Sequence, residues 1–196
     1  RHSVEPHEIL VHVNDGSDGT LQWVRQQGLA HTQTSGNVGV CLALNQLAAR
    51  ASGEWLLFLN DDMVCTPGWD TALAAAARSS GPRPLFLSSM LVEPTVARND
   101  LVRFANFGTD PSSFDESGLL AFAAASRFGD IAGAASQPTL VRRADWNLVG
   151  GYSVEFSPGM SSDDDFLMKL WLVGCRSYRV IGSSVVAWIW NWSSTP

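Results

Sequence analysis

Cysteine and histidine are both scarce in this sequence, and their positions exclude several kinds of site. The three cysteines (Cys41, Cys65 and Cys175) are odd in number and widely spaced, which argues against a disulfide framework and against a zinc site built on cysteine. This pattern is typical of buried free thiols in a reducing compartment, so we expect a cytoplasmic protein. All four histidines lie at or before residue 31, so the later part of the chain has no histidine that could bind a metal ion.

Charge is also low, and long hydrophobic runs are missing. Only 16% of the residues are charged and 45% are hydrophobic, which is typical of a globular chain rather than a disordered one. No apolar run reaches the roughly 20 residues that a membrane-spanning helix needs, and the start of the sequence shows no signal peptide. The net charge of −6 argues against a nucleic-acid-binding surface. A nucleotide ligand is still compatible with it, because a metal ion can supply positive charge.

The order of the predicted elements indicates one α/β domain, and 196 residues are enough for a substantial core. Short apolar runs typical of strands alternate with helical spacing of apolar residues over residues 8–92. This alternation predicts a mainly parallel central sheet with helices on both faces. The predicted strands are 8–14, 31–34, 55–59 and 85–92, and the predicted helices are 20–27 (capped by Asp18 or Thr20), 40–51 and 67–80. No repeat or low-complexity linker interrupts the sequence, so we expect a single domain over residues 1–196.

The second half of the sequence is less regular. We expect a variable excursion over the functional site at residues 99–129, then a strand at 139–142, a helix at 163–173 and final strands at 178–181 and 184–190. Three tryptophans near the end, Trp188, Trp190 and Trp192, have a spacing of two and share one face if the chain is extended. Core packing or a protein interface is the usual role of such residues, and a surface that stacks on sugars or contacts a lipid acceptor is the alternative.

The most informative segment is the end of the strand predicted at residues 55–59, which we expect to be the central strand. Its apolar run passes directly into Asn60, Asp61 and Asp62. An apolar run of this kind is usually buried on both faces, and open α/β sheets bind ligands at the carboxyl ends of their strands. Adjacent carboxylates there suit Mg²⁺ or Mn²⁺, which are held by one or two carboxylates together with substrate phosphates. A solvated turn is the alternative, because Asn and Asp favour turns.

Five motifs occur in one order along the chain. They are Asn14-Asp15-Gly16-Ser17, Asn37-x-Gly39 with Asn45 further on, Gly53-Glu54-Trp55 leading to Asn60-Asp61-Asp62, Val149-Gly150-Gly151-Tyr152, and Ser162-Asp163-Asp164-Asp165-Phe166 before Lys169. One short motif is weak evidence, but the ordered series resembles the family-2 glycosyltransferases, which are nucleotide-sugar dependent and usually inverting. The resemblance covers residues 8–93 and 130–190. It implies the GT-A-type nucleotide-diphospho-sugar transferase fold, with a nucleotide-binding half at 1–93 and an acceptor and catalytic half at 94–196.

The resemblance implies a nucleotide-binding role for five residues. Asp15 matches the acidic position that contacts the base, and Asn37 and Gly39 match the segment that lines the nucleotide pocket. Asn60 matches a position near the ribose, and Asp61 lies beside it as a nucleotide-binding or turn residue.

The resemblance also implies the metal ligand and the catalytic base. Asp62 would hold the Mg²⁺ or Mn²⁺ that bridges the diphosphate, and Asp163 would be the base. Residues implied on the acceptor side are Trp146, Gly151 and Asp164, with core packing as the alternative for Trp146. Lys169 stands where the family usually has arginine. At least one of the three acids at 163–165 is expected only to complement the helix dipole, with Asp164 and Asp165 the candidates.

The implied reaction moves a sugar from a nucleoside-diphosphate sugar (a UDP-, GDP- or dTDP-sugar) to a hydroxyl on a sugar or lipid-linked acceptor, with inversion. The resemblance further implies a role in cell-envelope polysaccharide biosynthesis and a cytoplasmic location. Peripheral association with the inner face of the membrane and homo-oligomer formation stay open. The alternative is a non-catalytic GT-A-like binding or scaffolding module. A sugar nucleotidylyltransferase is less well supported, because no glycine-rich phosphate loop with Arg or Lys follows a first strand.

Three departures from the family pattern favour the non-catalytic alternative. We expect the usual first strand of the family to be missing before residue 8. Ser162 replaces the glutamate that precedes the catalytic aspartate. Many relatives have a metal-binding histidine after the last strands, and the region 186–192 has none here. We therefore expect Asp62 to bind a metal ion mainly with the help of the nucleotide's phosphates.

Overall fold

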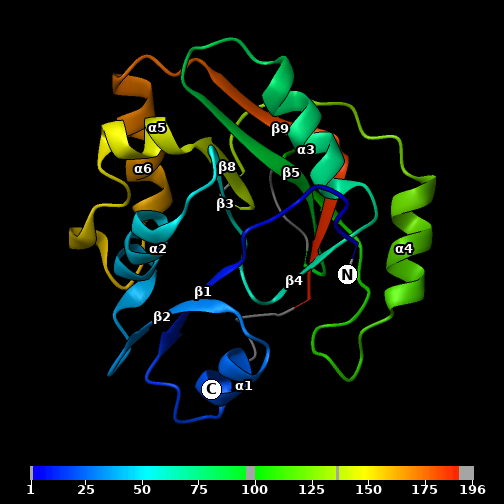
Figure 1. Ribbon diagram of the computed structural model, residues 1–196. Coiled ribbons are helices and arrows are strands. Elements are labelled where there is room, and N and C mark those ends of the chain that lie inside the picture. The colour runs from blue at the N-terminus through cyan, green and yellow to red at the C-terminus, as the bar shows by residue number, and fades with distance from the viewer. Residues whose placement is uncertain (1, 96–99, 136, 190–196) are drawn as a thin grey trace. The chain divides into compact units, whose positions relative to one another are not determined.

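The computed structural model describes residues 2–95, 100–135 and 137–189 (Figure 1). The chain divides into two compact units, each built from separate stretches of sequence. Unit 1 comprises residues 1–6, 57–140 and 176–196, and unit 2 comprises residues 7–56 and 141–175. The division falls inside β3 (Trp55–Phe58) and β8 (Thr139–Arg142), so each of these strands contributes residues to both units. The single domain over 1–196 and its halves at 1–93 and 94–196 stay predictions.

Unit 1 holds most of the main sheet. Its remaining elements are β4 (Met63–Cys65), α3 (Trp69–Ser79), β5 (Leu85–Glu93), β6 (Val102–Phe104), α4 (Glu116–Ala125), β7 (Ile131–Ala132) and β9 (Ser177–Trp188). The described strands follow the order β3-β8-β5-β9-β4, with β6 beside β5 and β7 beside β9. β5 runs parallel to β9 and to β6, whereas β4 and β7 are antiparallel to β9 and β8 is antiparallel to β5. The sheet is therefore mixed in direction.

The interior of the sheet is formed by β5 and β9, which run side by side in Figure 1. They are the longest strands, with 9 and 12 residues, and residues 85–92 of β5 are all buried. The expectation that residues 55–59 form the central strand was wrong. β3 stands at the end of the described strand order and its residues are only half-buried. The longer apolar runs of β5 and β9 take the centre because they bury more side-chain surface on both faces.

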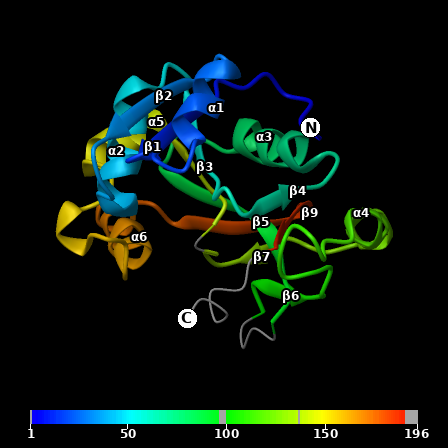
Figure 2. The same cartoon turned by 90° about the horizontal axis from the view of Figure 1, so that it is seen from below.

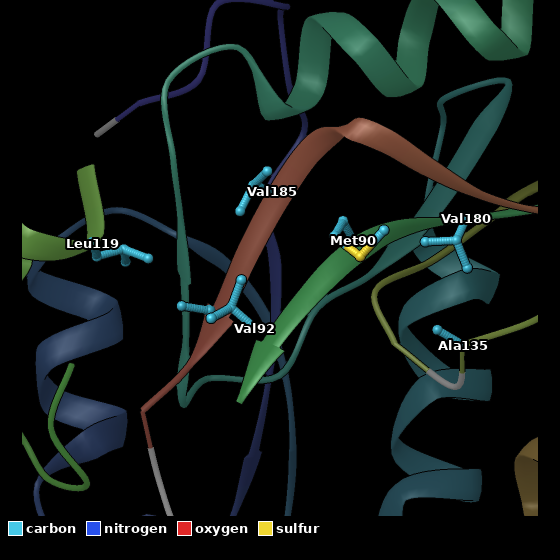
Figure 3. Packing of buried hydrophobic residues seen from close by; sticks show 7 residues of the cluster. Met90, Val92, Leu119, Ala135, Val180 and Val185 are labelled. Carbon is cyan, nitrogen blue, oxygen red and sulfur yellow. The ribbon is translucent and has the colours of Figure 1, made fainter. Parts of the chain in front are cut away.

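Helices and a hydrophobic cluster cover β5 and β9. α3 packs against both strands, and Figure 2 shows it on one side of β9 with β6 on the other. Leu119 of α4 is fully buried in a cluster with side chains of β5 and β9 (Figure 3). The cluster consists of Met90, Val92, Leu119, Ala135, Val180, Val185 and Ala187. The apolar patch inside the expected excursion at 99–129 is thus a helix that helps to close the core.

The two final strands expected at 178–181 and 184–190 are one strand, β9. Ser89 of β5 pairs with Ile181, but Met90 pairs with Val185, so β9 carries extra residues between these two pairs. A β-bulge of this kind interrupts the alternation of the sequence without ending the strand. Gly182 lies in the bulge, where a Cβ atom would be only 2.3 Å from the carbonyl oxygen of Phe128. Trp190 and Trp192 lie outside the described residues.

Unit 2 contains the elements predicted at 8–14, 20–27, 31–34, 40–51 and 163–173, together with a helix and a 3₁₀ turn that were not predicted. Its elements are β1 (Leu10–Asn14), α1 (Thr20–Gln26), β2 (Ala30–Thr34), α2 (Gly39–Arg50), α5 (Arg143–Val149), the 3₁₀ turn η1 (Val154–Phe156) and α6 (Ser162–Leu172). β1 and β2 form a separate parallel pair. The N-cap of α1 is Gly19, whose neighbour Asp18 accepts a hydrogen bond from the backbone N–H of Thr20 at 2.9 Å. The prediction that Asp18 or Thr20 caps this helix was wrong, because the cap position is Gly19 and no side chain caps the helix there.

Candidate active site

The nucleotide-binding residues predicted from the first motifs lie at the carboxyl ends of β1 and β2. Asn14 ends β1, and its side-chain oxygen accepts a hydrogen bond from the backbone N–H of Val38 at 3.1 Å. The side chain of Asn37 accepts one from the N–H of Gly39 at 2.9 Å. These bonds fix the segment 37–39 beside the ends of two parallel strands, where α/β proteins usually bind their ligands.

Asp15 holds an unusual backbone conformation at this edge. Its φ angle is 54°, in the left-handed region, and its N–H donates to the carbonyl oxygen of Thr34 at 2.9 Å. The exposed carboxylate accepts a hydrogen bond from the hydroxyl of Ser17 at 2.9 Å. A left-handed residue other than glycine costs about 1–3 kcal/mol and is found most often at functional sites, although aspartate tolerates it better than most residues. The turn therefore presents this carboxylate at the expected edge.

Gly39 is required by a close backbone approach. Its φ is 75°, and a Cβ atom there would lie 2.6 Å from the Cα atom of Pro158. The next residue, Val40, donates its N–H to the carbonyl oxygen of Pro158 at 2.8 Å. The start of α2 is thus held against the loop that leads into α6. Unit 2 thereby brings the Asn37-x-Gly39 segment together with the loop that precedes Asp163.

The three acids at the start of α6 have different surroundings. Asp165 accepts a hydrogen bond from the hydroxyl of Ser153 at 2.7 Å and forms an ion pair with Lys169 at 3.3 Å. Asp163 is half-buried and Asp164 is exposed. Among the residues that the structure describes, none donates a hydrogen bond to either of these two side chains. Asp165 therefore has a structural role, and Asp163 keeps a carboxylate that could accept a proton.

Ser162 and Lys169 each hold a loop that precedes Asp163 in the sequence. Ser162, which stands where the family has glutamate, is buried and donates its hydroxyl to the carbonyl oxygen of Gly159 at 2.7 Å. The ammonium of Lys169 donates to the carbonyl oxygen of Gly151 at 2.5 Å and to the hydroxyl of Ser153 at 2.9 Å. The Asp165–Lys169 pair thus connects α6 to the loop that carries the Gly-Gly-Tyr motif.

Asn45 holds that loop from the side of α2. Its amide N–H donates to the carbonyl oxygen of Tyr152 at 2.7 Å, and its oxygen accepts from the N–H of Tyr152 at 2.9 Å. Gly151 has a φ of 68°, and a Cβ atom there would lie 2.3 Å from the Asn45 side-chain oxygen. Sequence reasoning gave Asn45 no role of its own, because nothing local shows that it pairs with a residue 107 positions away.

Trp146 is buried beneath the same loop. It is only 7% exposed and packs against Tyr152 and Phe166, with ring centroids 5.4 and 5.1 Å apart. These contacts are those of a core residue, which was the alternative to the acceptor role expected for Trp146. His12 is similarly satisfied, because its two ring nitrogens lie 2.7 and 3.2 Å from the hydroxyls of Thr32 and Thr34. Burial lowers the pKa of His12 below its ordinary value.

The predicted metal ligand lies in unit 1. Asp62 follows the end of β3, and one of its carboxylate oxygens, Oδ2, accepts a hydrogen bond from the indole N–H of Trp188 at 2.6 Å. The other oxygen, Oδ1, is buried and has no hydrogen-bond partner among the described residues. Burial raises the pKa of the Asp62 carboxyl, the Trp188 bond opposes this rise, and the charge of Asp61 adds to it. Asp61 is exposed and Asn60 is half-buried.

The orphaned oxygen of Asp62 is what a hard divalent cation requires, so the residue fits a Mg²⁺ or Mn²⁺ ligand. The described part of the chain contains no group of three or more His, Cys, Asp or Glu side chains that could hold an ion together. That Asp62 binds an ion mainly with the help of the nucleotide's phosphates stays a prediction.

Trp188 is the residue at this site that sequence reasoning missed. It was assigned to a packing or stacking surface, but its indole donates to Asp62 because β4 and β9 pair with Met63 opposite Trp188. A partly buried indole N–H needs a hydrogen-bond acceptor, so a tryptophan in an apolar strand is a signal that an acceptor lies nearby.

The family model for glycosyl transferase family 2 matches residues 4–111, which is more than half of the chain. The chain belongs to this family. Among the described residues, no helix combines the length and the apolar character needed to cross a lipid bilayer. No curated protein sequence matches the chain.

Solved structures with the GT-A fold resemble this glycosyltransferase-family chain. S. aureus TarS (residues 1–349) has a TM-score of 0.59 at 16% identity over 92% of this chain and 50% of that one. GalNAc-T7 with UDP, GalNAc and Mn²⁺ has a TM-score of 0.66 at 13% identity over 94% and 38%. The mannosyltransferase PcManGT from Pyrobaculum calidifontis with GDP-Man and Mn²⁺ has a TM-score of 0.56 at 18% identity over 95% and 49%. The chain spans half the length of the TarS structure, and at these identities the likeness shows the fold.

Proposed function

We propose that this family-2 chain transfers a sugar from a nucleoside-diphosphate sugar to a hydroxyl acceptor, with inversion at the sugar. The observation that carries the proposal is the Asp62 carboxylate, which has one oxygen held by Trp188 and one buried oxygen without a partner among the described residues. Support comes from the similar structures, since TarS has been solved with UDP, GalNAc-T7 with UDP and Mn²⁺, and PcManGT with GDP-Man and Mn²⁺.

The contacts with the donor are proposed residue by residue. In unit 2, Asp15 would accept hydrogen bonds from the base, and Asn37 and Gly39 would line the nucleotide pocket. In unit 1, Asn60 and Asp61 would contact the nucleotide beside Asp62. The exposed carboxylate of Asp15 suits a base that presents N–H donors, because a carboxylate is a strong acceptor.

Asp62 would hold Mg²⁺ or Mn²⁺ through its orphaned oxygen. A bound divalent cation supplies Lewis-acid stabilisation of the negative charge that develops on the departing diphosphate. The role of the protein is to keep the Asp62 oxygen in place and dry. Trp188 and the buried position of Oδ1 both serve this purpose.

Asp163 would act as the general base. Its carboxylate accepts the proton of the acceptor hydroxyl as that oxygen bonds to the anomeric carbon and the bond to the diphosphate breaks. A positioned base of this kind contributes about 10²- to 10⁴-fold to the rate. Gly151 and Asp164 are proposed on the acceptor side, and Trp146 would act there only by supporting the loop through Tyr152.

Calorimetric titration with UDP, GDP and dTDP, each with and without Mn²⁺, tests the proposal. We expect the full chain to bind at least one of these nucleotides, and to bind it more tightly with Mn²⁺. Failure to bind any of them under either condition would contradict the proposal and favour the non-catalytic module. The cytoplasmic location, the role in cell-envelope polysaccharide synthesis, membrane association and homo-oligomer formation stay predictions.

A further inference from the structure

The end of β9 holds Asp62 at two points. The indole N–H of Trp188 donates to the carboxylate at 2.6 Å, and the backbone N–H of Ile189 donates to the carbonyl oxygen of Asp62 at 3.1 Å. The antiparallel register of β4 and β9, with Met63 opposite Trp188, places both donors beside this one residue. The side chain of Asp62 is therefore held by Trp188, the last residue of β9, and its backbone by Ile189, the residue that follows.

The bond from Trp188 engages Oδ2 of the carboxylate and leaves Oδ1 without a partner among the described residues. An aspartate side chain has two torsions, and a hydrogen bond to one oxygen from a rigid indole restricts both of them. A hydrogen bond to an ionised carboxylate is about twice as strong as one between neutral groups. Because the indole is neutral, the carboxylate keeps its full negative charge. Oδ1 is then presented in a fixed direction, with no described residue bonded to it.

We propose that Trp188 is a positioning residue for the metal ligand Asp62, fixing its carboxylate so that Oδ1 is available to a divalent cation. The inference rests on the proposed function. Residues that bond to a metal ligand from outside the coordination shell are known to matter, and their loss typically weakens metal binding by about 10- to 100-fold.

The variant Trp188→Phe tests the hydrogen bond with little change in packing volume. Free Mn²⁺ is measured by electron paramagnetic resonance, with UDP or GDP present as the nucleotide that calorimetry selects. We expect the full chain carrying Trp188→Phe to bind Mn²⁺ about 10- to 100-fold more weakly than the wild type. The matched control is Trp69→Phe, which removes another indole donor of unit 1, bonded to the hydroxyl of Ser3 at 3.3 Å. The control is expected to keep wild-type Mn²⁺ affinity.

A spectroscopic measurement covers the case in which Trp188→Phe does not fold. The protein contains eight tryptophans, and ¹⁵N labelling of tryptophan gives each indole N–H a separate signal. We expect Asp62→Asn to shift one of these signals strongly, because it removes the charge from the acceptor. Traces of Mn²⁺ with nucleotide should broaden that same signal in the wild type. A tryptophan that is not bonded to the metal ligand would not respond to both changes.

The outcomes separate this inference from the proposed function. Wild-type protein that binds no Mn²⁺ with any nucleotide would overturn both. Loss of Mn²⁺ binding in Asp62→Asn, together with wild-type affinity in Trp188→Phe, would overturn the role of Trp188 alone. If Trp188→Phe does not fold, an indole signal shifted by Asp62→Asn but untouched by Mn²⁺ would do the same.

Discussion

The acidic segments 60–62 and 163–165 belong to different units, but their carboxylates have a similar arrangement. Each contains one carboxylate that accepts a hydrogen bond from a side chain elsewhere in the fold, and one exposed acid. In the first segment Trp188 holds Asp62, and in the second Lys169 and Ser153 hold Asp165. The two segments differ in which acid remains available for chemistry.

The difference follows from the charge of the donor. The indole of Trp188 is neutral, so Asp62 keeps its negative charge and one unbonded oxygen for a cation. The ammonium of Lys169 balances the charge of Asp165, so that residue is committed to the fold. The available acid in the second segment is then its neighbour Asp163. A carboxylate held by a neutral donor can remain functional, whereas one paired with a cation usually serves the structure.

The largest expected effect comes from Asp163→Asn. The amide cannot take a proton, so we expect kcat for sugar transfer to fall by about 10²- to 10⁴-fold. The thermal unfolding temperature should stay unchanged, because no described residue donates to this side chain. Asp164→Asn is the matched control and should retain most of the activity. Equal losses in both variants would contradict the assignment of the base.

Asp165→Asn should give the opposite pattern. It weakens the bonds to Lys169 and Ser153, and we expect it to lower the free energy of unfolding by about 1–3 kcal/mol. Urea denaturation measures this change, with the exposed Asp164→Asn expected within about 0.5 kcal/mol of the wild type. Nucleotide affinity should persist in both. A stable Asp165→Asn protein without activity would show that Asp165, and not Asp163, does the chemistry.

The smallest expected effect is the contribution of His12 to the pH dependence of stability. This contribution must be known before pH effects are assigned to the two acidic segments. Because burial keeps its pKa below the usual value, the unfolded chain takes up the proton first as the pH falls. Stability should therefore decrease below pH of about 6.5 and be insensitive to this group above it. His12→Gln should reduce this slope in denaturation curves measured between pH 5 and 8. An unchanged slope would assign it to other groups.

Most strands and helices over residues 8–92 could be predicted from the sequence, because each of them carries a local pattern. Gly39 and Gly151 were found as motif residues, and their positive φ angles explain why glycine is needed there. The burial of residues 55–59 could not be predicted, because it depends on which strands take the centre of the sheet. The bond from Trp188 to Asp62 spans 126 residues and depends on the register of β4 and β9.

The spacing of Asp165 and Lys169 was readable as a helical i, i+4 pair, which fits the ion pair observed. What the spacing could not show is that Lys169 also reaches Gly151 and Ser153. The sequence therefore identified three adjacent acids but not which of them the fold had already engaged.

The division of roles between the two acidic segments is tested most directly by one paired titration. UDP or GDP is titrated into Asp62→Asn and into Asp163→Asn, each with and without Mn²⁺. We expect Asp62→Asn to lose the gain in nucleotide affinity that Mn²⁺ gives the wild type, and Asp163→Asn to keep it in full. Retention of the Mn²⁺ effect in Asp62→Asn, or its loss in Asp163→Asn, would contradict the account.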